Sequence, residues 1–111
     1  MIRLSITAKR RADMSTAHQM LEYLRDHHRT EGEAVKNRDL RSLFNLTDKQ
    51  VRNVVSQLRQ EGEPVCSSSY GYWYSTDPED IEKTLHRLEA QVENMFISIT
   101  GLRKALKGDK G

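Results

Sequence analysis

The chain has 111 residues and a formal net charge of +2; 31% of its residues are charged and only 6% are aromatic. This length suits one domain with an appended element, and no apolar run approaches the ~18 residues that a membrane-spanning helix requires. The N-terminus lacks the apolar stretch and cleavage site of a signal peptide, and the single Cys66 excludes an intramolecular disulfide. We therefore expect a cytoplasmic protein with a mostly aliphatic core.

Positive charge is concentrated in two segments of the chain. Residues 36–60 contain six Lys or Arg side chains and two acidic ones, and residues 1–15 contain the basic run Lys9-Arg10-Arg11. This distribution is typical of a nucleic-acid footprint. Residues 1–15 are interpreted as an N-terminal arm that contacts phosphates, or alternatively as a solvated terminus.

Two helices and a short extended segment are expected before residue 46. The first helix should run from about Thr16 to His28, and a very short strand is predicted over Glu33–Lys36. Asn37 should cap a second helix that ends near Phe44. The side chains expected to face the core are Ala17, Met20, Leu21 and Leu24 from the first helix and Leu40, Leu43 and Phe44 from the second.

The stretch from Leu46 to Gly62 is predicted to form a helix, and both its start and its end are marked in the sequence. Thr47 and Gln50 have the spacing of a capping box, and Gly62 occupies the position where a left-handed residue ends a helix. One face carries the apolar residues Val51, Val54, Val55 and Leu58. The opposite face carries Lys49, Arg52, Asn53, Ser56, Gln57 and Arg59. Such side chains pair with base edges in a DNA major groove, although an ordinary amphipathic helix with a solvated face has the same pattern.

The segment after Gly62 predicts a β-hairpin. Residues 64–67 and 72–75 are β-prone, and residues 68–71 are turn-like. Val65 is expected to pair with inward-facing Tyr72 and Tyr74, which leaves Trp73 on the other face. The helix before Leu46 and the helix after it are joined by a tight turn, which is the helix-turn-helix arrangement.

Residues 16–76 resemble a winged helix-turn-helix domain of the biotin-repressor-like bacterial and phage group. The likeness is carried by Leu40-Arg41-Ser42-Leu43-Phe44, Thr47-Asp48-Lys49-Gln50-Val51-Arg52, Leu58-Arg59-Gln60-Glu61-Gly62, Pro64-Val65, Ser67-Ser68 and Gly71-Tyr72-Trp73-Tyr74. The resemblance implies a mainly α fold with a small β-hairpin, in which helix 48–60 is the recognition helix and turn 67–71 is the wing tip.

The resemblance also implies which residues meet DNA. Lys49, Arg52, Asn53, Ser56 and Gln57 would face the major groove. Phosphates would be met by Arg38 and Arg41, and the backbone or minor groove by Ser68, Ser69 and Tyr70. The wing tip of this chain departs from the family pattern because it has no Arg or Lys.

The C-terminal third predicts one long helix. Asp77 should cap it and Pro78 should be its first residue. Apolar residues then alternate at spacings of four and three, as a coiled-coil seam does: Ile81, Leu85, Leu88, Val92, Met95, Ile99, Leu102 and Leu106. A helix from Pro78 to Leu106 would be about 43 Å long at ~1.5 Å per residue, which is more than the small domain can cover. Residues 77–107 are therefore predicted to form a homodimerisation helix, with folding back onto the domain as the alternative; residues 108–111 are a tail.

No catalytic residue, cofactor or metal site is predicted. His27 and His28 are adjacent and so point in different directions on a helix, and Cys66 has no second cysteine for a zinc site. Cys66 is expected to be a small buried residue, with a reactive thiol as the alternative. The expected function is that of a small dimeric transcriptional regulator that binds double-stranded DNA and is not an enzyme. The alternative is a winged-helix adaptor, or a phage-encoded inhibitor or accessory protein, that acts through protein contacts.

Overall fold

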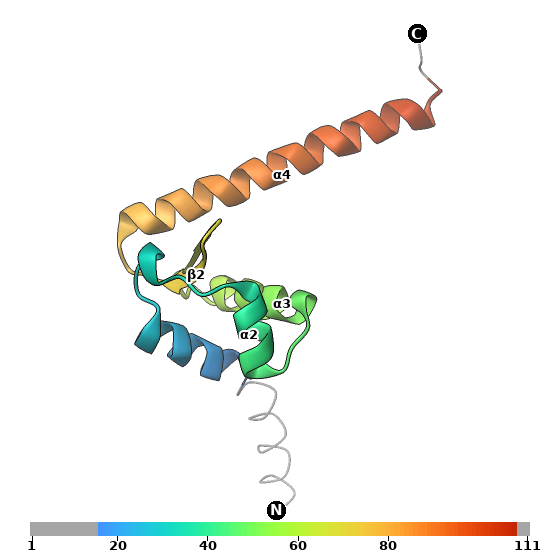
Figure 1. Cartoon of the computed structure of the whole chain (residues 1–111). Helices are drawn as coiled ribbons and strands as arrows, with labels where there is room; N and C mark the ends of the chain where they lie inside the picture. Colours follow the sequence, from blue (N-terminus) through green and yellow to red (C-terminus); the bar gives the residue numbers. More distant parts are fainter. Residues whose placement is uncertain (1–15, 109–111) are drawn as a thin grey trace, which may run out of the picture. The chain divides into compact units, whose positions relative to one another are not determined.

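The computed structural model describes residues 16–108, which are mainly helical with one two-stranded hairpin (Figure 1). Residues 16–27 are helical and are followed by a 3-10 turn η1 (Glu31–Glu33), α2 (Asn37–Phe44), α3 (Asp48–Gln60), β1 (Val65–Ser68), β2 (Gly71–Tyr74) and α4 (Pro78–Leu106). The chain divides after Ile81 into two compact units. The described parts of these units are called the N-terminal unit (residues 16–81) and the C-terminal unit (residues 82–108). The predicted N-terminal arm lies outside the described residues.

One aliphatic core holds the N-terminal unit together. All four apolar residues predicted on the first helix are buried, which confirms that stripe, although the helix stops one residue before His28. The core consists of Ala17, Met20, Leu21, Leu24, Val35, Leu40, Val51, Val55, Leu58 and Val65, with Tyr23, Phe44, Leu46, Val54, Tyr72 and Tyr74 packed around it. Every described element of this unit before α4, apart from η1, therefore contributes to a single core.

α2 differs from its prediction at two residues. Asn37 is the first helical residue and not the cap, because Lys36 precedes it in an extended conformation and no side chain caps the helix. Leu43 was predicted to face the core, but it is 55% exposed. Leu43 and Phe44 lie on opposite flanks of the buried Leu40, and only the flank with Phe44 packs against the core. The rings of Phe44 and Tyr23 meet edge to face, with their centroids 5.9 Å apart.

α3 begins and ends as its sequence predicts. The Thr47 side chain accepts a hydrogen bond from the Gln50 amide at 3.1 Å, and the Gln50 side chain accepts one from the Thr47 amide at 2.9 Å. This reciprocal pair is the predicted capping box. After α3, Gly62 has a positive φ of 89°, and the chain turns from helix into the hairpin.

The hairpin is a two-stranded antiparallel sheet in which Val65 pairs with Tyr74 and Cys66 with Trp73. A single bridge joins Val35 to Tyr72 on the outer edge of β2 through two backbone hydrogen bonds of 2.8 and 2.9 Å. The predicted strand at Glu33–Lys36 is thus reduced to one bridging residue, and Glu33 belongs to η1 instead. A side chain at Gly71 would place its Cβ 2.3 Å from the Val35 carbonyl oxygen, so only glycine allows this close approach.

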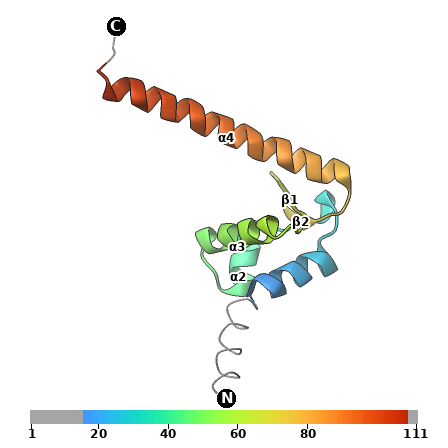
Figure 2. The ribbon, with the colours of Figure 1, turned by 180° about the vertical axis from the view of Figure 1, so that it is seen from behind.

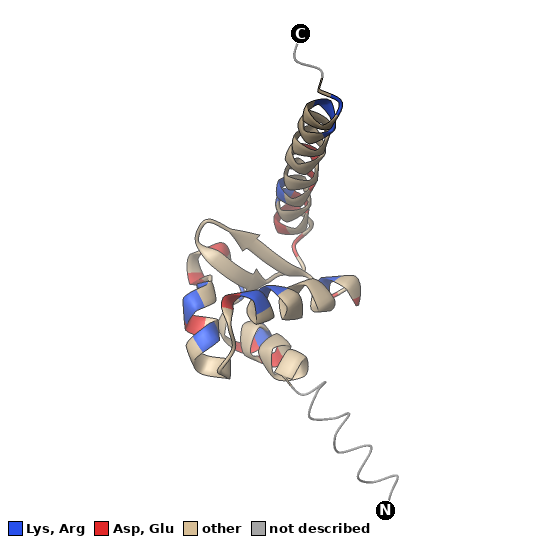
Figure 3. Cartoon of the chain, turned by 90° about the vertical axis from the view of Figure 1, so that its right-hand side faces the viewer, with Lys and Arg blue, Asp and Glu red and all other residues tan. Residues whose placement is uncertain are grey.

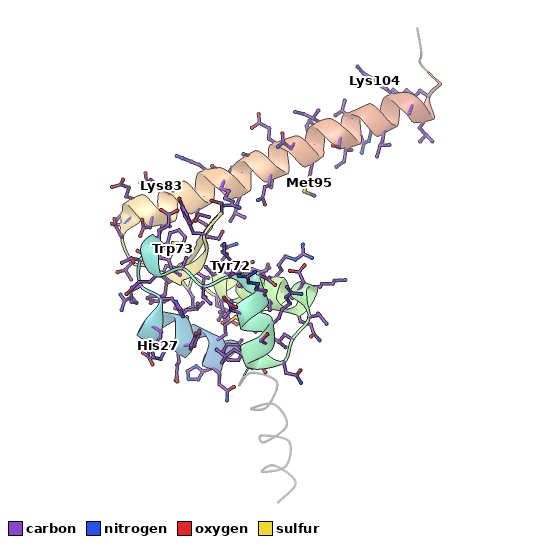
Figure 4. The ribbon with its side chains drawn as sticks, viewed as in Figure 1. His27, Tyr72, Trp73, Lys83, Met95 and Lys104 are labelled. Carbon is purple, nitrogen blue, oxygen red and sulfur yellow. The ribbon has the colours of Figure 1, made fainter. Side chains whose placement is uncertain are left out.

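The other face of the hairpin is also buried. Cys66 is 1% exposed and Trp73 3% exposed, which agrees with the prediction that Cys66 is a small buried residue. The Trp73 indole donates a hydrogen bond of 3.3 Å to the Asp80 carboxylate in the first turn of α4. Tyr72 and Trp73 are consecutive residues of β2 (Figure 4), so their side chains point to opposite faces of the hairpin.

α4 is a continuous helix of 29 residues (Figure 2). The Asp77 side chain accepts a hydrogen bond from the Glu79 amide at 3.0 Å, which confirms Asp77 as its cap. Most of its apolar residues are exposed, and these are Leu85, Val92, Met95, Phe96, Ile97, Ile99, Leu102 and Leu106. No described helix is long and apolar enough to cross a membrane.

Candidate nucleic-acid interface

The packing of α2 against α3 sets the geometry of the candidate interface. Only Asn45, Leu46 and Thr47 separate the two helices, and Asn45 adopts a left-handed conformation with φ 55°. The Asn45 and Leu46 amides both donate to the Arg41 carbonyl at the end of α2, and the Leu46 bond is 3.0 Å long. This tight turn fixes the direction in which α3 leaves α2.

Five predicted DNA-contacting residues lie on one free face of α3. The opposite face is fixed in the core through Val51, Val55 and Leu58, which are at most 2% exposed. Because the helix repeats every 3.6 residues, burial of this stripe turns the polar positions outward. The exposed side chains are Lys49, Arg52, Asn53, Ser56 and Gln57. The structure thus brings this predicted set together.

Arg59 does not belong to that free face, although the sequence pattern placed it there. Its Nε donates a hydrogen bond of 2.8 Å to the Val65 carbonyl, and its Nη2 donates one of 2.9 Å to the Ser67 hydroxyl. The side chain is partly buried between α3 and β1. Arg59 therefore holds the helix against the hairpin, and the face offers one cation fewer than the sequence indicates.

Acidic and amide neighbours modify the free face. The Asp48 carboxylate lies 2.9 Å from the Arg52 guanidinium one turn along α3, and both side chains are more than half exposed. Gln57 donates a hydrogen bond of 3.3 Å to Glu61. Exposed pairs of this kind contribute only ~0.3–0.5 kcal/mol, so a phosphate or a base edge can replace them. The side chains of Lys49 and Asn53 form no hydrogen bond or ion pair with any other described residue.

α2 supplies two further cations. Arg38 and Arg41, the two residues predicted to meet phosphates, are exposed, and Arg38 lies 4.0 Å from the neighbouring Asp39 carboxylate. Figure 3 shows basic residues along both α2 and α3. The two helices that pack at the tight turn therefore both present positive charge to solvent.

The turn of the hairpin carries Ser68, Ser69 and Tyr70, and a cation that the sequence did not predict there. Ser68 accepts a hydrogen bond of 3.1 Å from the Tyr70 amide, while the Tyr70 side chain is 64% exposed. The Lys36 Nζ donates to the Ser69 carbonyl at 3.5 Å across 33 residues of chain. The turn lacks basic residues of its own, but the Val35–Tyr72 bridge brings Lys36 to it. The strand predicted over residues 33–36 was the one feature of the sequence that could have indicated that Lys36 lies beside the hairpin.

The predicted dimerisation residues are placed along α4. Leu85, Val92, Met95, Ile99 and Leu102 are exposed, whereas Ile81 and Leu88 are partly buried. Figure 4 shows Met95 and Lys104 extending from opposite sides of the helix. Within the C-terminal unit, the seam side of α4 is apolar, whereas the opposite side carries Lys104 together with the exposed Ile97.

Over residues 16–108, no group of three or more His, Cys, Asp or Glu side chains is placed to hold a metal ion. Comparison of the chain with protein-family models, with curated proteins and with solved structures gave no match.

Proposed function

We propose that this protein is a small dimeric DNA-binding transcriptional regulator with a winged helix-turn-helix domain. α3 is its recognition helix, and Lys49, Arg52, Asn53, Ser56 and Gln57 read the major groove. The proposal is carried by one observation above all. Five side chains able to bond base edges or phosphates share the only solvent-facing side of a helix whose other side is locked in the core.

The chemistry of these side chains supports the proposal. Arg pairs with guanine through two parallel hydrogen bonds, and Asn and Gln pair with adenine in the same way. Lys49, Arg38 and Arg41 add point charges for phosphates, which fix position and not sequence. Lys36 at the hairpin turn adds a charge where a wing meets the DNA backbone. The whole set lies within the N-terminal unit.

The apolar side of α4 supports a homodimer. An exposed apolar stripe of this length marks an interaction surface, and its heptad spacing suits another helix. A two-fold dimer would read two half-sites of a palindromic operator.

The experiment starts from duplexes that the protein selects from a random DNA library. Affinity for the selected duplex is then measured by fluorescence anisotropy between ~50 and ~200 mM salt, where release of counterions from phosphates lowers the binding constant steeply. Arg52→Ala combined with Asn53→Ala should weaken binding at least ~10-fold. The matched control Arg87→Ala removes an exposed arginine from α4 and should change binding little. The proposal would be overturned if the affinity for the duplex changed neither with salt concentration nor with the α3 substitutions.

The Asp48–Arg52 pair favours a second candidate, a protein-binding adaptor. The pair offsets the positive charge of Arg52, and the 55% exposed Leu43 offers an apolar contact on the adjoining α2. For an adaptor, the salt titration shows no counterion release, and no duplex is enriched from the library. The same experiment therefore separates the two candidates.

A further inference from the structure

The apolar side of α4 is a continuous seam, in which Ile81 and Leu88 are partly buried and the other apolar residues are exposed. Its two heptad positions carry Ile81, Leu88, Met95 and Leu102 in one row and Leu85, Val92, Ile99 and Leu106 in the other. Two such apolar rows at alternating spacings of three and four are the packing surface of a coiled coil. They do not decide whether the two helices run parallel or antiparallel.

The charge of α4 is polarised along its length, and this favours one direction. From residue 78 to residue 94, acidic side chains outnumber basic ones five to two. From residue 95 to residue 107 there are three basic side chains and no acidic one, and Figure 3 shows basic residues near this end. A parallel pair would set acidic half against acidic half and basic half against basic half. An antiparallel pair sets each acidic half against the basic half of the other copy.

On one flank of the seam, Glu82 and Arg103 agree with this direction, whereas Glu89 and Phe96 on the same flank form no charge pair. Glu82 and Arg103 occupy the same heptad position on the same flank of α4, and in antiparallel helices like flanks face each other. Glu82 of one copy then meets Arg103 of the other, and the two-fold axis produces this pair twice. In a parallel pair, Glu82 and Arg103 stay far apart, because 21 residues span about 31 Å at ~1.5 Å per residue. The opposite flank is uncharged and consists of Thr84, which is buried, and of the exposed Gln91, Ser98 and Ala105.

We propose that two copies of this chain associate through antiparallel α4 helices, in a register where the acidic half of each helix lies along the basic half of the other. This inference rests on the proposed homodimer and adds its direction and register. Residues of the two copies then pair across the seam in four combinations, each of which the two-fold axis produces twice. The pairs are Ile81 with Leu106, Leu85 with Leu102, Leu88 with Ile99, and Val92 with Met95.

Disulfide formation between single-cysteine variants of the full chain tests the register. A disulfide needs Cα atoms about 4.4–6.8 Å apart. Leu85→Cys and Leu102→Cys, mixed and oxidised with a glutathione buffer, should give a mixed dimer. Each variant alone should give no disulfide-linked dimer, because the two copies of residue 85 lie about 26 Å apart in the antiparallel pair. Mass spectrometry identifies the joined peptides.

Two controls accompany this test. The wild-type chain should remain unlinked, because its only thiol, that of Cys66, is 1% exposed. Lys104→Cys lies on the side of α4 opposite the seam and should link to neither variant. The molar mass of the wild-type protein is measured by light scattering and should be that of a dimer.

Three results carry different meanings. A mixed disulfide without self-linked variants supports the antiparallel pair. Self-linking of Leu85→Cys alone and of Leu102→Cys alone overturns the inference but leaves the proposed homodimer in place. A monomer without any disulfide overturns both the antiparallel register and the proposed homodimer, and would indicate that a different protein binds the apolar face. DNA binding by the N-terminal unit is measured separately and does not depend on these outcomes.

Discussion

The Arg59 guanidinium donates a hydrogen bond of 2.8 Å to the Val65 carbonyl and so ties the last turn of α3 to the first residue of the hairpin. A second bond, to Ser67, completes the attachment. The candidate interface depends on this attachment, because it combines residues of α3 with residues of the hairpin turn. Arg59 therefore has a structural role, whereas Arg38, Arg41 and Arg52 are exposed to solvent.

We expect Arg59→Ala to lower the free energy of unfolding by about 1–3 kcal/mol, because it removes two bonds from a charged donor at a partly buried site. Urea unfolding followed by circular dichroism measures this. The control is Arg52→Ala on the same helix, which should cost no more than ~0.5 kcal/mol because that side chain is exposed. Equal effects of the two substitutions would contradict the structural role of Arg59.

Gly71→Ala should destabilise the N-terminal unit by at least ~2 kcal/mol. A Cβ at this position would meet the Val35 carbonyl oxygen at 2.3 Å, and the residue has a φ of 129°. Gly62→Ala is the matched control, because Gly62 has a positive φ of 89° but no atom within 4 Å of its added Cβ. It should cost only ~1 kcal/mol. Thermal unfolding of both variants separates the close contact from the backbone strain.

Asp48→Asn should strengthen DNA binding. The change removes a negative charge beside the phosphates and releases Arg52 from its ion pair, while asparagine keeps the shape of the side chain. The effect is measured as the dissociation constant for the selected duplex. Asp26→Asn makes the same change at an exposed site on the first helix and should leave affinity unchanged. Weaker binding by Asp48→Asn would contradict the placement of α3 in the groove.

Lys36→Ala should lower the slope of the logarithm of the binding constant against the logarithm of salt concentration by about 1, the loss expected for one phosphate contact. The reduction should be similar for specific and random duplexes, because a lysine on the backbone carries no sequence information. Lys104→Ala, an exposed lysine on α4, is the comparison and should leave the slope as it is. An unchanged slope for Lys36→Ala would remove the hairpin turn from the interface.

Charge reversal on α4 should weaken the dimer and a double reversal should restore it. Glu82→Lys places like charges opposite Arg103 at two symmetric sites, and exposed pairs are worth ~0.2–1 kcal/mol each. We expect a rise of about 2- to 30-fold in the dimer dissociation constant by analytical ultracentrifugation. Adding Arg103→Glu exchanges the two charges and should return the constant to near its original value. Failure of the double variant to recover would argue against the antiparallel register.

Signals confined to neighbouring residues predicted the structure well. The Thr47–Gln50 capping box, the Asp77 cap and the buried stripes of the first helix and α3 are all set by spacings of three and four residues. Such spacings follow from helix geometry and need no knowledge of the fold. The five exposed residues on α3 followed from the same rule.

Features that depend on distant segments were missed. Lys36 reaches the hairpin turn only because Val35 forms a bridge with Tyr72, and Arg59 is occupied only because β1 packs beside the end of α3. Leu43 looks like a core residue by periodicity, but the core contacts the Leu40 and Phe44 side of α2 only. Periodicity gives the direction of an apolar stripe, and tertiary packing gives its width.

The length of α4 acquires a meaning of its own in an antiparallel pair. Twenty-five residues separate Ile81 from Leu106, so the two copies of Ile81 would lie about 37 Å apart along the helix pair at ~1.5 Å per residue. The separation of the two copies of Ile81 would then be set by the length of α4 alone, and each inserted heptad would increase it by about 10 Å.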